Sequence, residues 1–70
     1  MNKLITVTDA LDFVANSGVA EWEFGGRASA EGFAKWLFDN RSEVNPYDYG
    51  AELRQYLLSV GEDPSDYGLA

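Results

Sequence analysis

The sequence predicts a small α+β domain, with about three helices and a short two- or three-stranded β element. Three observations predict it. Apolar residues recur at helical spacing in three segments, one further segment alternates apolar and charged residues, and glycine or Asn-Pro signals separate the segments. Seventy residues suffice for one domain, which we expect to span residues 1–70.

The first helix is expected over residues 7–16. A start signal of the form T-x-x-D runs from Thr6 to Asp9, and either of its two threonines can cap the helix. The acidic residue then lies in the first turn, where the helix dipole favours it. Apolar residues follow at helical spacing, and Gly18 ends the pattern.

Residues 19–24 alternate cleanly, which predicts a half-buried strand. One face would carry Ala20, Trp22 and Phe24, and the other face would carry Glu21 and Glu23. Gly25-Gly26 then predicts a hairpin turn. A lone strand is not stable, so either a return segment at 27–29 or residues 3–7 must pair with it, and the sequence leaves that choice open.

A second helix is expected to begin at Ser29 or Ala30 and to end at Asn40. Phe33, Trp36 and Leu37 lie on one face at helical spacing. We therefore expect this face to pack into the core.

The third helix has the clearest pattern. Asp48 is its expected cap, and Gly61 is its expected C-terminal stop. Its apolar stripe consists of Tyr49, Leu53, Tyr56, Leu57 and Val60. The tail, residues 62–70, either docks on the domain through Tyr67 and Leu69 or is frayed.

The chain has no Cys and no His, which excludes disulfides, zinc fingers and imidazole sites together. The usual general base and the strongest nucleophile are therefore missing, and the serines fit caps and loops better than catalysis. The acidic segment 62–66 lacks the glycine of a calcium loop. We expect no enzymatic activity, no cofactor and no bound metal.

Charge indicates the kind of partner. Twelve acids against five bases give a net charge of −7, which disfavours direct binding to nucleic acid or to anionic membranes and favours a basic protein. The first residues do not form a signal peptide, and no apolar run reaches the length of a membrane span. We expect a monomer in the cytoplasm.

The negative charge is concentrated in the last third of the chain, where six acids face Arg54 alone. A single-sign surface focuses the electric field and speeds encounter with an oppositely charged partner. Tyrosines outside the helical stripe would add short-range contacts. The predicted partner-binding residues are Glu21, Glu23, Glu43, Tyr47, Asp48, Glu52, Glu62, Asp63, Asp66 and Tyr67.

In its length, its lack of Cys and His, its dense aromatics and these carboxylates, the chain resembles the small acidic proteins that phages deploy against host defences. Anti-CRISPR proteins and other DNA mimics belong to this group. The resemblance implies a non-enzymatic inhibitor that occupies the Lys/Arg-lined DNA site of a CRISPR effector or another nuclease in the host cytoplasm. Glu21 and Glu23, about 6.6 Å apart on a strand, are spaced on the order of nucleic-acid phosphates. The alternative is an antitoxin-like or regulatory interaction module without nucleic-acid mimicry.

Overall fold

Helix α1, Val7–Asn16, begins where the sequence predicts, because its cap is complete. The structure, a computed structural model, describes residues 2–69. The Thr6 hydroxyl accepts a hydrogen bond from the Asp9 amide at 3.3 Å, and the Asp9 carboxylate accepts one from the Thr6 amide at 2.9 Å. This reciprocal pair satisfies two amides that the helix itself leaves free. Phe13 and Val14 then lie in the core.

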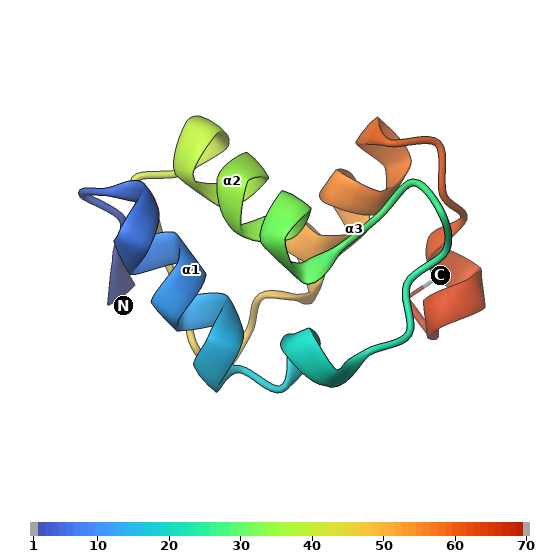
Figure 1. Cartoon of the computed structure of the whole chain (residues 1–70), viewed down its shortest axis with the longest axis horizontal. Coiled ribbons are helices and arrows are strands. Elements are labelled where there is room, and N and C mark those ends of the chain that lie inside the picture. Colours follow the sequence, from blue (N-terminus) through green and yellow to red (C-terminus); the bar gives the residue numbers. More distant parts are fainter. Residues whose placement is uncertain (1, 70) are drawn as a thin grey trace.

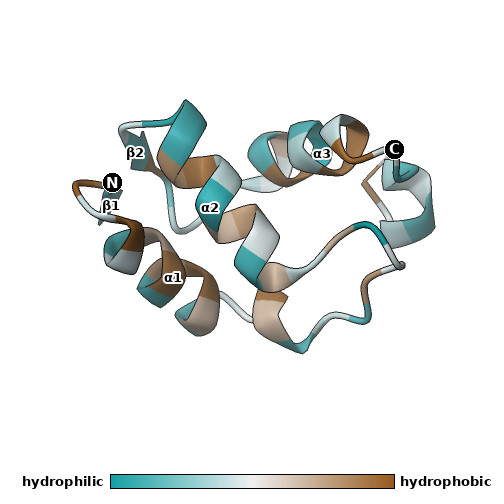
Figure 2. Ribbon diagram, turned by 45° about the horizontal axis from the view of Figure 1, so that its top comes forward, coloured by the Kyte–Doolittle hydropathy of each residue, from teal (hydrophilic) through white to brown (hydrophobic). Residues whose placement is uncertain are grey.

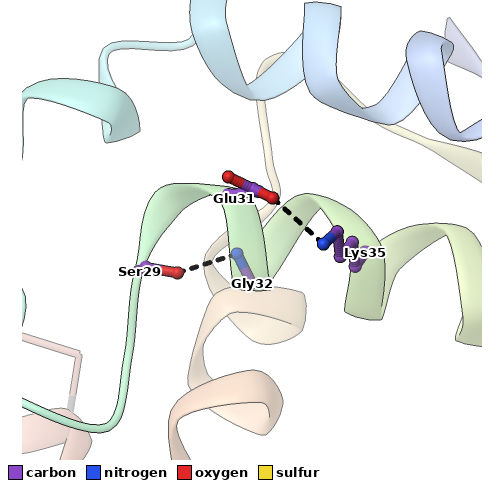
Figure 3. A network of polar contacts seen from close by, with 4 residues as sticks. All are labelled: Ser29, Glu31, Gly32 and Lys35. Atoms are coloured by element: carbon purple, nitrogen blue, oxygen red, sulfur yellow. Dashed lines mark hydrogen bonds and ion pairs between the residues drawn. The ribbon is translucent and has the colours of Figure 1, made fainter.

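Helix α2, Ala30–Asn40, begins after Ser29, whose hydroxyl accepts a hydrogen bond from the Gly32 amide at 2.9 Å (Figure 3). Phe33 and Leu37 are fully buried, as predicted. Trp36 is only partly buried, and the Arg41 guanidinium lies over its ring at 5.1 Å from the centroid. The predicted apolar face of α2 is therefore centred on Phe33 and Leu37.

Gly32 is required by the approach of the next helix. A Cβ atom at this position would collide with the hydroxyl of Tyr56 on helix α3, Gly50–Ser59. The same hydroxyl accepts a hydrogen bond from the Ser29 amide at 3.1 Å, and the Tyr56 ring packs against Phe33 at 5.6 Å. A residue that weakens a helix in isolation thus permits close packing between two helices.

The C-terminal end of α3 is as the sequence predicts, whereas its N-terminal cap differs from the prediction. Gly61 adopts a left-handed conformation with φ of +80°, and the following amide donates to the Leu57 carbonyl at 2.9 Å, as in a glycine-terminated helix. The prediction that Asp48 caps the helix is wrong. Tyr49 stands at the N-cap without a capping side chain, and the Asp48 amide instead closes a turn to the Asn45 carbonyl at 3.2 Å.

The predicted strand at 19–24 and its hairpin at Gly25-Gly26 are also wrong. Val19–Glu21 forms a short 3-10 helix, η1, after Gly18 turns the chain with φ of +87°. Residues 22–29 form an irregular loop with a turn at 26–27. The aromatic side chains of this loop pack on Tyr67 of the C-terminal tail, and no strand within residues 2–69 pairs with the loop.

The β element consists of β1, Asn2–Lys3, and β2, Glu43–Val44, paired antiparallel with Lys3 opposite Glu43. The Leu4 amide continues the ladder to the Ser42 carbonyl at 2.9 Å. The N-terminal segment is therefore one of the two strands of the sheet. It pairs with β2, which follows α2, and not with residues 19–24. Burial of Leu4 and Val44 in the core fixes this pairing.

Helix α2 lies between α1 and α3 in both views of the ribbon (Figures 1 and 2). The β pair lies beside the N-terminus, and the C-terminal tail lies at the opposite end of the long axis (Figure 1). The core between the elements consists of Leu4, Ala10, Phe13, Val14, Val19, Phe33, Ala34, Leu37, Val44, Leu53, Tyr56 and Leu57. The architecture is the small α+β domain that the sequence predicts.

Candidate functional site: an acidic surface around an aromatic cluster

The C-terminal tail docks on the loop that follows η1. A second 3-10 helix, η2, spans Pro64–Tyr67, and Pro64 is buried. The Tyr67 ring stacks against Trp22 at 6.4 Å and packs against Phe24 at 5.6 Å, while Trp22 and Phe24 lie 6.1 Å apart. These three rings form one aromatic cluster. The tail thus docks on the domain, as one of the two alternatives predicted, and both Tyr67 and Leu69 are partly buried against it.

Two hydrogen bonds fix the loop to the tail. The Gly25 amide donates to the Tyr67 hydroxyl at 2.7 Å, and the Arg27 amide donates to Glu62 Oε1 at 3.4 Å. A Cβ atom at Gly25 would collide with the Glu62 carboxylate, so a glycine permits this close approach. Gly25 therefore takes part in a loop-to-tail contact and not in a hairpin.

Five carboxylates belong to the two segments that carry the aromatic cluster. They come from η1, from the loop between the two aromatics, and from the tail: Glu21, Glu23, Glu62, Asp63 and Asp66. Arg27 is the basic residue of the same segments, and its guanidinium lies beside Gly61. We call these five carboxylates with Trp22, Phe24 and Tyr67 the aromatic–acidic surface. Five negative charges against one positive charge give it a strongly negative potential.

Asp63 has a structural role within this surface. Its carboxylate caps η2 by accepting hydrogen bonds from the Ser65 amide at 2.9 Å and from the Ser65 hydroxyl at 2.8 Å. The amide bond, followed by the hydroxyl bond, lowers the pKa of Asp63 below its usual value of 3.8. The carboxylate therefore remains negatively charged at any pH at which a protein partner would bind.

The remaining predicted site residues lie elsewhere. Glu43 stands opposite Lys3 in the β pair, which lies at the other end of the molecule from η2, and Tyr47 and Asp48 follow in the loop between β2 and α3 (Figure 1). Tyr47 is 94% exposed, whereas Tyr67 is partly buried in the aromatic cluster.

Glu52 is a special case among the predicted carboxylates. It lies half-buried in the first turn of α3, where the helix dipole favours an acid. Its Oε2 atom is shielded from solvent and has no hydrogen-bond donor among the described residues. Glu52 therefore offers less of its carboxylate to a partner than the exposed acids do.

Trp22 is the site residue that sequence reasoning placed in the core. The structure leaves 37% of it exposed, as part of the aromatic–acidic surface. No second segment next to residues 19–24 alternates in the same way. This indicates that the aromatic residues pack against something other than a strand. Aromatic side chains that are partly exposed to solvent are typical of protein contact surfaces.

The structure also bears on metal and membrane binding. Within residues 2–69, no three Asp or Glu side chains come together as ligands for a metal ion. Over the same residues, no helix has the length and apolar character to cross a bilayer.

A groove of about 430 Å³ lies between β1 and α1 and is lined by Phe13, Lys3, Asp12 and Asn16 among others.

Comparison with known proteins gives no assignment. No protein family, no curated protein and no solved structure matches the chain. The function of this chain is therefore inferred from its own geometry and charge.

Proposed function

We propose that this protein is a non-enzymatic inhibitor that binds a basic nucleic-acid-handling protein, a CRISPR effector complex, in the cytoplasm of the host cell. Its acidic surface takes the place of DNA on the effector and blocks DNA binding. The observation that carries the proposal is the joining of two acidic segments from distant parts of the chain through one aromatic cluster.

The charge distribution supports this mode of binding. Lysines and arginines that hold DNA are arranged to neutralise phosphates, and carboxylates can satisfy the same groups. The tail is joined to the loop by stacking and by the Gly25–Tyr67 hydrogen bond, so the two acidic segments already lie together before binding. Preorganisation lowers the entropic cost of association.

Trp22 adds contacts that salt does not screen. An arginine of the partner can stack on its exposed ring, and such cation–π contacts contribute about 0.5–2 kcal/mol. The chain itself contains a contact of this kind, between Arg41 and Trp36. The exposed indole therefore complements the carboxylates around it.

The same indole supports a second candidate function, an antitoxin-like or regulatory interaction module without mimicry of DNA. Tryptophan is enriched among the residues that dominate protein–protein binding energy. Such a module would bind its basic partner at a site that does not hold nucleic acid. Competition with DNA distinguishes the two functions.

The test measures binding of labelled duplex DNA to purified CRISPR effector complexes by fluorescence anisotropy while this protein is added. We expect the protein to displace the DNA from at least one effector, with an affinity that falls as salt rises because exposed charges are screened within about 8–10 Å at 0.1–0.15 M ionic strength. A triple reversal of exposed acids, Glu21→Lys with Glu23→Lys and Asp66→Lys, should abolish displacement.

The chain offers a matched control with the same number of reversals and the same net charge. Asp12, Asp39 and Glu43 are also exposed but lie on α1, α2 and β2, so their reversal to lysine should leave displacement nearly unchanged. Equal loss in both triple variants would show that only net charge matters. Binding to an effector without loss of DNA would favour the regulatory module, and no binding to any effector would contradict the proposal.

A further inference from the structure

We propose that the groove between β1 and α1 binds a small organic zwitterion with a net positive charge, of the chemical class of free arginine. The groove has a volume of about 430 Å³ and lies at the opposite end of the long axis from the C-terminal tail (Figure 1). None of its residues belongs to the aromatic–acidic surface, so this inference is independent of the proposed function. The residues that line the groove are Asn2, Lys3, Asp9, Asp12, Phe13, Asn16, Ser17 and Pro46.

The groove has the size and the mixed character of a small-molecule site. Pockets that hold small ligands typically enclose about 300–1,000 Å³ and combine apolar surface with a few polar groups. Here Phe13 and Pro46 supply apolar surface. Phe13 is a core residue, and its ring meets the Tyr49 ring edge-on at 5.4 Å. The Tyr49 hydroxyl donates to the Ser17 carbonyl at 2.9 Å, so this part of the groove is fixed by the core.

The α1 wall of the groove supplies hydrogen-bond acceptors. Asp9, Asp12 and Asn16 lie three and four positions apart, which places them on one side of the helix. Asp9 Oδ2 accepts the amides of Ile5 and Thr6 at 3.0 and 2.9 Å, so this carboxylate serves mainly the helix cap. The exposed Asp12 carboxylate has no ion pair and no hydrogen bond within residues 2–69. The Asn16 side-chain nitrogen donates to the Asp12 carbonyl at 2.8 Å, which leaves the Asn16 side-chain oxygen as a further acceptor.

The β1 wall supplies the opposite charge. Lys3 lines the groove from β1, and its ammonium group forms no ion pair in the part of the chain that the structure describes. Its cross-strand neighbour, Glu43, does not line the groove. The groove therefore has two carboxylates on its helical wall and one ammonium group on its strand wall.

This pair of walls selects the class of ligand. An anion is repelled by the two aspartates, and a metal ion is a poor fit because no three acidic side chains come together within residues 2–69. Free arginine carries two positive groups and one carboxylate, which complement the two carboxylates and the one ammonium group of the groove.

A guanidinium group suits the α1 wall better than a simple amine does. It is planar, it binds a carboxylate through two parallel hydrogen bonds, and its remaining N–H groups are free for a neighbouring acceptor. Asp12 is the carboxylate without a partner, and the Asn16 side-chain oxygen lies one turn further along α1. The methylene stem of the ligand then packs on the apolar surface of Phe13 and Pro46.

The experiment records the backbone amide signals of the full chain by NMR while L-arginine is added. We expect saturable shifts at the residues that line the groove, with a Kd of about 1 mM or tighter. L-Citrulline has nearly the same shape but an uncharged urea group, and it should bind about tenfold more weakly or not at all. L-Argininamide lacks the carboxylate. It should bind more weakly than L-arginine despite its higher positive charge, because Lys3 then has no partner in the ligand.

Two substitutions test the two walls. Asp12→Asn should weaken binding of L-arginine by about tenfold, because it removes the unpaired carboxylate. Asp39→Asn is the matched control, because Asp39 is also an exposed helical aspartate but does not line the groove, and it should leave the affinity unchanged. Lys3→Gln should weaken binding although it makes the chain more negative. Circular dichroism should show that every variant is folded.

The absence of saturable shifts at the groove overturns the proposal. So do shifts centred on Trp22 and Tyr67, because they place the cation on the aromatic–acidic surface. Tighter binding of L-argininamide than of L-arginine, citrulline binding as tight as that of arginine, or equal losses in Asp12→Asn and Asp39→Asn also overturn it, because the groove then does not recognise the charges of the ligand. Displacement of DNA from an effector depends on none of these results, so a failure of this inference is distinguishable from a failure of the proposed function.

Discussion

The helical half of the molecule and the loop-and-tail half are built by different means. Helices α1 and α2 are encoded locally, since their caps join residues three apart and their buried residues recur within each helix. The loop at 22–29 is held to the tail by hydrogen bonds that join residues 42 and 35 positions apart. The candidate binding surface lies on the second half, where geometry depends on long-range contacts.

This difference has energetic consequences. Packing of a continuous core is cooperative, whereas a segment held by a few exposed contacts can open by itself. Variants in the two halves should therefore behave differently in global and in local measurements. The predictions below run from the largest expected effect to the smallest.

Phe33→Ala should have the largest effect, because Phe33 is fully buried and packs against Tyr56 of α3. Loss of a buried phenylalanine costs about 3–5 kcal/mol, which is a large fraction of the stability of so small a domain. Chemical denaturation measures the change in the free energy of unfolding. A loss under about 1 kcal/mol would contradict a core centred on α2.

Thr6→Ala should lower global stability by about 1 kcal/mol, because it removes the hydroxyl that caps α1. Thr8→Ala is its matched control, since Thr8 is exposed and the cap is formed by Thr6. Equal effects of the two substitutions in thermal unfolding would mean that the cap contributes nothing.

Tyr67→Phe should act locally. It keeps the stacked ring and removes the hydroxyl that accepts the Gly25 hydrogen bond, which costs about 0.5–1.5 kcal/mol. Hydrogen exchange at the Gly25 amide should accelerate, whereas exchange in α1 and α2 should not change. Acceleration throughout the helices would show that the tail is part of one cooperative unit with the core.

Lowering the pH should have the smallest effect among these tests, and it should act on the tail. The folded-state pKa of Asp63 is lowered below 3.8, so its capping contribution is complete above about 3.8 and is lost as the pH falls through that lowered value. The chemical shift of the Ser65 amide should follow this titration. Asp63→Asn should remove it, and a titration midpoint above 3.8 would contradict the cap.

The sequence by itself determined the α+β class and all three helices. It did so because a cap such as Thr6 and a stop such as Gly61 act within one turn, and because burial of residues like Phe33 follows helical spacing. It also determined the strongly acidic character of the chain and the predominance of carboxylates in its last third. These properties depend on nearest neighbours or on composition.

Only the tertiary structure decided the strand pairing and the membership of the acidic surface. Alternation at residues 19–24 describes which side chains share a face, but it does not say whether a strand or a tail covers that face. Burial of Val44 and Leu4 selected the β pair, and stacking of Tyr67 on Trp22 brought two acidic segments together while Glu43 stayed at the far end. The outcome depends on the relative free energies of contacts between residues far apart in the chain, and no local sequence pattern specifies these.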